Sequence, residues 1–574
     1  MPDDGGAVAA AASALFERPH ADVLIIGGGI NGLATFRDLA LQGVDVALVE
    51  RRDIAVGATA ASSHMIHGGV RYLENGEFRL VHEAVTERND LLRTAAHYVR
   101  PLRTTIPIFT TFSGLFSAPL RFLRHGAGRR TERGALLIKL GLTIYDAFSR
   151  GRGRVPRHTF RGRRRSLRAL PRLNPRVEYT ATYWDASLRD PERLALDVLT
   201  DALEAGPHAR AATYVEAVES RAGRIVLRDV RDGRECEFAA SVVVNASGPW
   251  TDLTNVGLGV PSRLVGGTKG SHIVLDHPEL LEATGGRELF FEHRDGRVVL
   301  IYPLKGRVLV GTTDIEHDMR EPIVCTDEEV AYFFDLIGHV FPGIPVDAGQ
   351  IVHRFAGVRP LPGHGDVAPG YVSRDYRIER GALPGGAGVV LLSLVGGKWT
   401  TFRALGERLS NVVLAELGVA RRTGTRGLAI GGGRGFPRGQ RARERWLDMH
   451  THGVDRARAR VLLERYGTRA VAVMARMRDD ADDRPLTSAP TYSTGELRHL
   501  ARTELIWHLD DVLLRRTSLA FTGQANEAVA REVADVVAGV LGWDTRRIED
   551  EVRRALEMID PGQVRTEEAT WPTT

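Results

Sequence analysis

The sequence is poor in cysteine and lacks any long apolar run. Its 574 residues include two cysteines, Cys236 and Cys325, which excludes a disulfide framework and favours a reducing compartment. No apolar stretch reaches the ~18 residues that a membrane-spanning helix needs. The first twenty residues are rich in alanine, but they lack the basic start and continuous apolar core of a signal peptide. We therefore expect residues 1–20 to be a disordered extension.

Lysine is also scarce, because arginine takes its place almost throughout. Of the 77 basic residues only four are lysines, namely Lys139, Lys269, Lys305 and Lys398. Such a bias is typical of a GC-rich genome. A lysine retained against this background indicates a position that needs a compact ammonium instead of a guanidinium. Lys269 and Lys398 both lie in glycine-flanked segments and are the two of interest.

What the sequence does contain is an ordinary globular composition with one strongly basic stretch. Hydrophobic residues make up 43% and charged residues 26%, and the length suits two or three domains. The stretch 121–172 has a net charge of +14, whereas the whole chain has +5. It follows residues 106–123, which are rich in Phe and Leu.

An apolar segment beside a basic cluster is typical of proteins that dock on an anionic membrane surface. The alternative is an arginine-rich, solvated insertion over a buried apolar segment. Nucleic acid would be attracted by the same charge, but no recognised binding motif accompanies it. We therefore expect an anionic membrane surface, and no nucleic acid, as a partner.

Residues 22–50 have the pattern of a dinucleotide-binding unit. A short apolar run precedes Gly27, and Gly27, Gly29 and Gly32 have G-x-G-x-x-G spacing. The first glycine permits a tight turn, the second lets the backbone approach a pyrophosphate, and the third lets the helix pack on the strand. Glu50 ends the next strand, where a ribose-binding acid belongs. This pattern predicts a pyrophosphate at the helix N-terminus; the alternative is a glycine-rich structural turn.

The chain after Glu50 favours a flavin over a nicotinamide. It continues with ATAASSHMIHGGVRYL, whose small residues suit a segment that runs along an extended cofactor. Two later segments, 241–250 and 389–414, repeat a strand that ends in small residues, and the helix N-terminus of the second suits the electron-rich end of an isoalloxazine ring. The cofactor contacts predicted in these segments are Ser62, Ser63, His67, Gly248, Trp250, Gly397 and Thr400.

These patterns predict an α/β fold with three parts. A discontinuous, Rossmann-like FAD-binding domain is expected at 21–105, 190–260 and 350–415. An antiparallel-sheet substrate domain is expected at 106–189 and 261–349, because residues 268–312 alternate between apolar and polar with turn signals. Helical periodicity predicts an all-helical C-terminal cap domain at 432–565. The glycine-rich segment 431–439, at the start of this range, is predicted to be a linker.

The motifs, in this order, resemble those of the FAD-dependent glycerol-3-phosphate dehydrogenase family, the membrane-associated and quinone-linked type. The matching segments are GGGINGLATFRDLALQG, ASSHMIHGGVRYLENGEFRLVHEAVTER, NASGPW, KGSHIV, YPLKGRVLVGTTD, FAGVRPL, SRDYRI, SLVGGKWTTFRALGE and, in the helical cap, TELIWHLDDVLLRRTSLAF. His64 departs from the family, which commonly has lysine there. The resemblance implies FAD as cofactor, glycerol 3-phosphate as substrate and a membrane quinone as acceptor. It also implies a cytoplasmic location on the inner face of the cell membrane, and it leaves a homodimer open.

Oxidation of sn-glycerol 3-phosphate to dihydroxyacetone phosphate removes a hydride from C2 and a proton from its hydroxyl. The site therefore needs cations for the phosphate, a proton acceptor and a dry flavin face. Arg359 and Arg374 suit the phosphate, because a guanidinium binds phosphate bidentately. Arg71 and Tyr72 follow a glycine turn and would line the same pocket.

His272 is the predicted proton acceptor, because imidazole titrates in the useful range. Arg359 is the alternative base, and Lys398 would lie by the flavin and stabilise its reduced form. Each residue also has a structural alternative, a salt bridge for the arginines and core packing for His272 and Tyr72. No histidine lies in a metal-spaced cluster, so no catalytic metal is expected. Two other functions stay open, a glycerol-3-phosphate oxidase that uses oxygen and a non-enzymatic flavin-binding scaffold.

Overall fold

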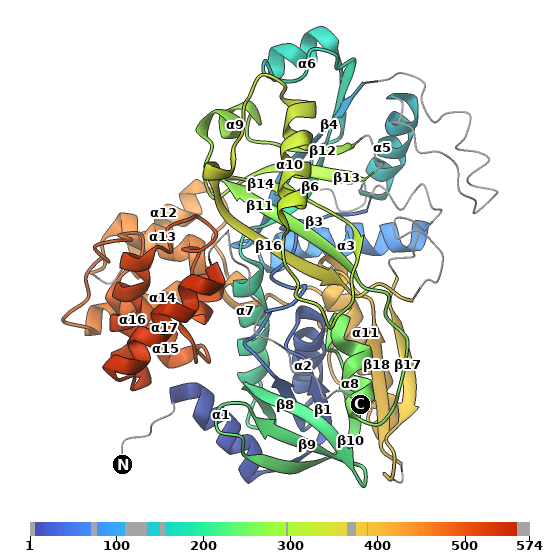
Figure 1. Cartoon of the computed structure of the whole chain (residues 1–574), viewed down its shortest axis with the longest axis vertical. Coiled ribbons are helices and arrows are strands. Elements are labelled where there is room, and N and C mark those ends of the chain that lie inside the picture. Colours follow the sequence, from blue (N-terminus) through green and yellow to red (C-terminus); the bar gives the residue numbers. More distant parts are fainter. Residues whose placement is uncertain are drawn as a thin grey trace.

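The computed structural model describes residues 6–69, 77–109, 135–149, 155–293, 297–363, 375–386, 388–451 and 453–559. These residues form a mostly parallel sheet, a mostly antiparallel sheet and a C-terminal helical region (Figure 1). In the view of Figure 1 the parallel sheet lies below, the antiparallel sheet above, and the helical region, in orange and red, at the left. The α/β fold class predicted from the sequence is confirmed.

The first sheet is built from strands that lie far apart in the sequence. Its order is β17-β18-β10-β1-β2-β7, and a β8–β9 hairpin extends from β10. The pairs from β18 to β7 are parallel, and β17 is antiparallel at the edge. The strands are β1 (His20–Ile26), β2 (Val46–Glu50), β7 (Ala209–Thr213), β8 (Val215–Arg221), β9 (Arg224–Asp229), β10 (Glu235–Asn245), β17 (Arg377–Ala382) and β18 (Val390–Val395).

Helices cover this sheet because its central strands carry apolar side chains on both faces. One face packs against α2 (Ile30–Gln42), α7 (Pro191–Leu203) and α11 (Phe402–Leu417). The other face packs against the β8–β9 hairpin and an N-terminal helix, α1 (Gly6–Glu17). A short helix, α8 (Thr251–Gly257), follows β10.

The prediction that residues 1–20 are disordered is wrong for residues 6–17, which form α1. Val8, Ala12 and Leu15 are buried, and their i, i+4, i+7 spacing gives the helix one apolar stripe. The helix packs on β7 and α15 (Thr494–Thr503). Alanine has the highest helix propensity, so the alanine content that resembled a low-complexity tail instead favours the helix once this stripe finds a partner.

The second sheet has the order β15-β11-β14-β13-β12-β4-β6-β3, with β16 beside β11 and β5 beside β6. Its pairs are antiparallel except β12 with β4. The strands are β3 (Met65–Ile66), β4 (Val99–Ile108), β5 (Thr159–Gly162), β6 (Tyr179–Leu188), β11 (Thr268–Leu275), β12 (Glu288–Glu292), β13 (Val298–Leu304), β14 (Arg307–Gly311), β15 (Ile315–Glu316) and β16 (Ile351–Arg359). Helices α6 (Arg163–Ala169), α9 (Pro278–Ala283) and α10 (Asp327–Val340) flank it.

Two predicted domain boundaries differ from this pairing. The boundary at residue 105 cuts through β4, which pairs along its whole length with β6. The segment 350–359 was expected in the FAD-binding domain, but it forms β16 and pairs with β11. Sequence pattern identifies a strand, but it does not identify the distant strand that becomes its neighbour. The other domain boundaries stay predictions.

The C-terminal region is helical and has its own apolar core. Its elements are α12 (Gln440–His450), α13 (Arg456–Tyr466), α14 (Ala470–Asp479), α15, α16 (Glu527–Leu541), α17 (Thr545–Ile559) and one π-helical turn, η9 (Asp511–Arg516). The predicted linker is closely packed: a Cβ at Gly432 would lie 1.9 Å from the Tyr466 carbonyl oxygen, and one at Gly433 would lie 2.1 Å from that of Thr94. Both cysteines are free. Within the described ranges, none of the helices has the length and apolarity that crossing a membrane requires.

Candidate functional site

The glycine turn between β1 and α2 depends on close backbone approaches. Gly27 has φ +116°, and a Cβ on it would lie 2.6 Å from the Ala246 carbonyl oxygen at the end of β10. A Cβ on Gly32 would lie 2.1 Å from the Gly27 carbonyl oxygen. At Gly29, in contrast, the nearest atom is Thr59 Oγ1 at 3.4 Å. The outer two glycines therefore close the turn, while Gly29 leaves space beside the N-terminus of α2. The cofactor-binding roles of the three glycines stay predictions.

Glu50 lies beside this turn. Its carboxylate accepts hydrogen bonds from the backbone N–H groups of Gly28, at 2.7 Å, and Arg52, at 3.0 Å. Burial raises the pKa of Glu50, although these two hydrogen bonds act in the opposite direction. The acid at the end of β2 thus contacts the glycine turn itself, and its ribose-binding role stays a prediction.

Three segments distant in sequence meet at the N-terminus of α2. A 3₁₀ turn, η6 (Trp399–Thr401), follows β18; Trp399 Nε1 donates to the Thr59 carbonyl at 2.9 Å, and Thr400 Oγ1 donates to the His67 carbonyl at 3.1 Å. Gly397 has φ +110°, and a Cβ there would lie 2.3 Å from Asn31 Nδ2. The structure therefore brings the predicted cofactor residues of these segments together.

The same place has features that an extended dinucleotide fits. Asn31 Oδ1 is buried and has no hydrogen-bond partner among the described residues, so a donor on a bound ligand would satisfy it. Gly248, after β10, has φ +64° and open space where a Cβ would lie. Trp250, two residues later, packs over Gly57, where a Cβ would lie 3.0 Å from the indole ring. The open positions and the unsatisfied acceptor suit FAD.

The predicted proton acceptor and the predicted phosphate-binding arginine share one face of the second sheet. Along β11 and β16 the register pairs Thr268 with Arg359, Gly270 with Gly357 and His272 with Phe355, and alternate residues of a strand share a face. Gly270 makes room for the guanidinium of Arg359, since a Cβ there would lie 2.2 Å from Nη2. The missing side chain is thus what allows Arg359 to lie across the strand toward His272.

Two more glycines shape this face. A Cβ on Gly311 would lie 2.2 Å from the His272 ring, and one on Gly357 would lie 2.4 Å from Ala61 Cβ. The backbone loop that carries Ser62 and Ser63 therefore lies directly on the face. The candidate cofactor loop and the candidate catalytic residues meet here.

His272 is buried and oriented from two sides. Its ring stacks on Phe355, with the centroids 4.9 Å apart, and its Nε2 lies 2.9 Å from Ser63 Oγ. Nδ1 has no hydrogen-bond partner among the described residues. Burial, and then the charges of Arg359 and His64, hold the pKa of His272 well below its ordinary value. The imidazole is therefore neutral at neutral pH, and the lowered pKa also makes it a weaker base than a free imidazole.

Arg359 is held by a segment to which sequence analysis gave no role. Its Nη2 donates to Thr312 Oγ1 at 2.9 Å, and its Nη1 donates to the Thr313 carbonyl at 3.2 Å and to Asp314 at 3.3 Å. Its side chain remains 26% exposed, so a ligand can reach it. These three residues belong to the segment YPLKGRVLVGTTD, which resembles the family. That resemblance was the one sequence feature that could have indicated their role.

The retained lysines have different surroundings. Lys269 lies on the opposite face of β11 from His272, and its Nζ donates to Glu329 at 3.0 Å and to the Val324 carbonyl at 2.7 Å. It holds α10 to the sheet. Lys398 is the N-cap residue of η6, beside the predicted cofactor contacts, and it interacts electrostatically with Glu83.

Some of the predicted site and membrane-docking residues lie outside the described part of the chain, and Phe109 packs against the core. Arg71, Tyr72 and Arg374 lie outside the described residues, as do 110–134 and 150–154 of the predicted membrane-docking region. Phe109, expected to help in lipid contact, instead packs against the core of the second sheet, with its ring 4.9 Å from that of His339. It follows β4 directly, so the strand directs it inward.

His64 contacts residues of several elements. Its Nδ1 lies 3.1 Å from the Leu188 carbonyl oxygen, and its ring centroid lies 5.2 Å from that of Phe521. Burial, followed by the charge of Lys305, lowers its pKa to about 4.

One cluster of metal-ligand types occurs among the described residues. His508, Asp510 and Glu551 place one ligand atom each within 4.8 Å of the others. Arginines already neutralise the two acids: Arg547 lies 2.7 Å from Glu551, and Arg515 lies 2.9 Å from Asp510. The cluster is an ion-pair network, and sequence spacing did not predict it because Glu551 lies on another helix.

Comparisons with known proteins show the family to which the chain belongs. Residues 22–408 match the family model described as FAD dependent oxidoreductase, and residues 423–548 match the C-terminal domain of alpha-glycerophosphate oxidase. A glycerol-3-phosphate dehydrogenase from Pseudomonas aeruginosa is 32% identical over 87% of this chain and 91% of its own length. A D-erythritol 1-phosphate dehydrogenase from Brucella abortus is 35% identical over 67% of this chain and 72% of its own.

The fold is also similar to that of a solved structure. The glycerol-3-phosphate dehydrogenase from Bacillus halodurans, solved in complex with FAD, superposes with a TM-score of 0.71 at 22% identity. The superposition covers 97% of this chain and 99% of that one.

The glycine turn yields a first prediction. Gly29→Val should fold but lose its flavin, because Gly29 has an ordinary backbone conformation and only Thr59 near its Cβ position, while the new side chain would occupy the space left for the pyrophosphate. Gly338→Val, in α10 with no atom within 4 Å of the Cβ position, is the matched control. Flavin absorbance per mole of folded protein is the measurement. Full flavin content in Gly29→Val would show that the phosphate site is misplaced.

Proposed function

The chain belongs to the FAD-dependent glycerol-3-phosphate dehydrogenase family, and from that membership we propose that it oxidises sn-glycerol 3-phosphate to dihydroxyacetone phosphate and passes the electrons to a membrane quinone. The observation that carries the proposal is the shared face of β11 and β16. There a neutral buried imidazole, an accessible guanidinium and the cofactor loop lie together.

When bound, FAD would supply the acceptor for the hydride that leaves C2. Arg359 binds the phosphate with its exposed edge while Thr312 and Asp314 fix its orientation. The positive charge of Arg359 also favours the neutral form of His272. In this proposal His272 takes the proton of the C2 hydroxyl. We propose that Arg71, Tyr72 and Arg374 complete the substrate pocket and that Lys398 lies by the flavin and stabilises its reduced form.

A longer phosphorylated polyol is the second candidate substrate. The identity of 35% with a D-erythritol 1-phosphate dehydrogenase favours it, and both substrate classes present a phosphate and a secondary alcohol. The ratio of kcat/KM for glycerol 3-phosphate and D-erythritol 1-phosphate separates the two. Oxygen is the alternative acceptor, and turnover with a quinone analogue, compared with turnover under oxygen alone, separates an oxidase from a quinone-linked enzyme.

We propose docking on an anionic membrane surface through the basic stretch. Arg163, Arg164 and Arg165 begin α6 and are exposed, so they are available to lipid phosphates. The quinone would then reach the protein from the membrane.

The phosphate-binding role of Arg359 predicts a substrate-dependent loss. Arg359→Ala should impair oxidation of glycerol 3-phosphate more than that of glycerol, by about 1.5–3 kcal/mol in kcat/KM, since a charge-assisted contact with phosphate is lost. Arg354→Ala is the matched control, because Arg354 lies on the opposite face of the same strand and pairs with Asp327. Equal losses for both substrates would remove Arg359 from phosphate recognition.

The role of His272 predicts both a rate and a pH dependence. His272→Asn should slow flavin reduction on the order of a hundredfold or more, with little change in substrate affinity. The base must be neutral, and its pKa lies well below 6.5; the wild-type rate should therefore stay constant from neutral pH to below that value and fall only at lower pH. A limb near the ordinary histidine range, which the sequence alone suggested, is not expected.

Stopped-flow flavin reduction at several pH values measures both effects. His353→Asn is the control, because His353 is a second buried histidine, on β16, with a pKa lowered to about 4 by burial. A His272→Asn variant that reduces its flavin at the normal rate would transfer the proton-accepting role to Arg359 or to solvent.

The docking proposal predicts a charge-specific effect on vesicle binding. Replacing Arg163, Arg164 and Arg165 by alanine should weaken binding to anionic vesicles by about 1 kcal/mol per charge and should lower quinone reduction, while reduction of a soluble dye persists. The control replaces three exposed arginines of the helical region, Arg441, Arg445 and Arg546, with the same change in net charge. If both triple variants bind alike, α6 is not the docking face.

A further inference from the structure

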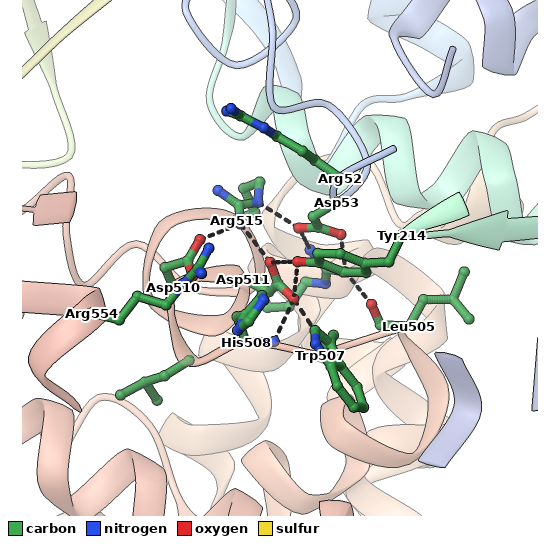
Figure 2. Close-up of polar contacts among 12 residues, drawn as sticks. Arg52, Asp53, Tyr214, Leu505, Trp507, His508, Asp510, Asp511, Arg515 and Arg554 are labelled. Carbon is green, nitrogen blue, oxygen red and sulfur yellow. Dashed lines mark hydrogen bonds and ion pairs between the residues drawn. The ribbon is translucent and has the colours of Figure 1, made fainter. Parts of the chain in front are cut away.

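Asp53 is a buried acid three residues after Glu50. Arg516 binds it bidentately, with Nη2 2.8 Å from Oδ1 and Nη1 2.5 Å from Oδ2. Arg515 Nε lies 2.5 Å from Oδ2, and Figure 2 shows Arg515 beside Asp53. Both arginines end η9 in the C-terminal helical region. A loop of the cofactor-binding sheet is thus attached to a region more than 400 residues away in sequence.

The two arginines are themselves held in place. Arg515 Nη2 donates to Asp510 at 2.9 Å and to Asp511 at 2.6 Å. Arg516 Nη2 donates to the Glu504 carbonyl at 2.7 Å. Because every partner is fixed by the helical region, these guanidiniums present Asp53 with donors in a set geometry.

Asp511 adds a second link from the helical region to the parallel sheet. Its carboxylate accepts hydrogen bonds from the Tyr214 hydroxyl at 2.8 Å and from the N–H groups of Trp507 and His508 at 2.9 Å (Figure 2). Tyr214 follows β7, and its N–H donates to the Arg52 carbonyl at 3.2 Å. The backbone beside Asp53 is therefore tied twice to the same cluster.

On its other side this loop holds the glycine turn. Glu50 accepts from Gly28 N–H at 2.7 Å, and Ala55 N–H donates to the Gly28 carbonyl at 3.1 Å. Residues 50–55 therefore bond to Gly28 at both ends and to the ion-pair cluster at Asp53 in the middle. A shift of Asp53 would move Glu50 and Ala55 relative to the turn.

Ion pairs this deeply buried are costly to form, and a well-packed apolar replacement is often as stable. Burial alone would raise the pKa of Asp53, but the charges and hydrogen bonds of Arg516 and Arg515 outweigh it and hold the pKa below the usual range. Asp53 is therefore ionised, and its bidentate contact has a directionality that apolar packing lacks. The contact between Asp53 and Arg516 therefore fixes the position of residues 50–55 in addition to any effect on stability.

We propose that Arg515 and Arg516 are positioning residues for the ADP half of FAD, acting through Asp53 on the loop that sets Glu50 against Gly28. The helical region is then part of the cofactor site without touching the cofactor. By reciprocity of coupled equilibria, bound FAD also strengthens the attachment of the helical region. The inference rests on FAD binding and is independent of the substrate proposed above.

The variants Asp53→Asn, Arg516→Ala and Arg516→Lys test this role. Asp53→Asn and Arg516→Ala should weaken FAD binding roughly tenfold or more, and Arg516→Lys should restore part of the affinity because it keeps the charge. The reduction potential and the reduction rate per bound flavin should stay at wild-type values, because the isoalloxazine end is not perturbed. The measurement is FAD release from diluted holoprotein, followed by flavin fluorescence without any substrate.

Thermal unfolding distinguishes positioning from a purely structural role. A positioning role predicts that the rise in Tm caused by excess FAD becomes smaller in the variants, whereas a structural role lowers Tm equally with and without FAD. Arg531→Ala, which removes an exposed ion pair with Glu549 in the same region, should change neither quantity.

Tyr214→Phe removes only a hydroxyl and keeps the test decisive if the charge variants fail to fold. It should weaken FAD binding by a smaller factor. Unchanged FAD affinity in the folded variants, or an equal loss of Tm with and without FAD, would overturn the proposal. Failure of glycerol 3-phosphate to reduce the flavin would leave this result intact, so the two proposals fail separately.

Discussion

The close contact between Gly32 and the carbonyl of Gly27 is the constraint on which the cofactor site depends. It presses the first turn of α2 against the end of β1, and the contact of Gly27 with Ala246 presses the same turn against β10. Because β1 lies between β2 and β10, with β18 beyond, the ends of four parallel strands open at this turn. The carboxyl ends of the strands are where open α/β sheets bind their ligands. Glu50, Gly248 and the β18–η6 segment reach it for this reason.

Glycines also permit close approaches in the second sheet, which carries the proposed substrate-binding residues. Gly270, Gly311 and Gly357 lack the side chains that would separate Arg359, His272 and the cofactor loop. The absence of these side chains therefore brings together the groups that are proposed to react. Burial then makes His272 a neutral imidazole, and Arg359 reinforces this effect. Geometry orients the histidine, whereas its electrostatic surroundings keep it unprotonated and also lower its basicity.

Local patterns were predictable from the sequence, and long-range partners were not. The spacing of Gly27, Gly29 and Gly32 and the position of Glu50 predicted the turn, because each depends on neighbours within about one βαβ unit. The alternation in 268–312 predicted antiparallel strands, and these are present. The family resemblance then supplied FAD and the family itself, which the comparisons confirm.

The misses all involve contacts between distant segments. Neither the pairing of β16 with β11 nor the hydrogen bond of Ser63 to His272 can be inferred from spacing, since register depends on the assembled sheet. The α1 stripe needs β7 to bury it. Asp53 has no local pattern that points to Arg516 in the helical region.

The central claim is that a phosphorylated polyol is oxidised by a flavin at the shared face of β11 and β16. The most direct test mixes the wild-type holoprotein with sn-glycerol 3-phosphate in the absence of oxygen. The expected result is rapid, complete loss of the oxidised flavin absorbance, saturating with substrate concentration, and much slower loss with glycerol at the same concentration. A flavin that stays oxidised with glycerol 3-phosphate would contradict the proposed activity. It would leave the protein as a flavin-binding scaffold or an enzyme for another substrate.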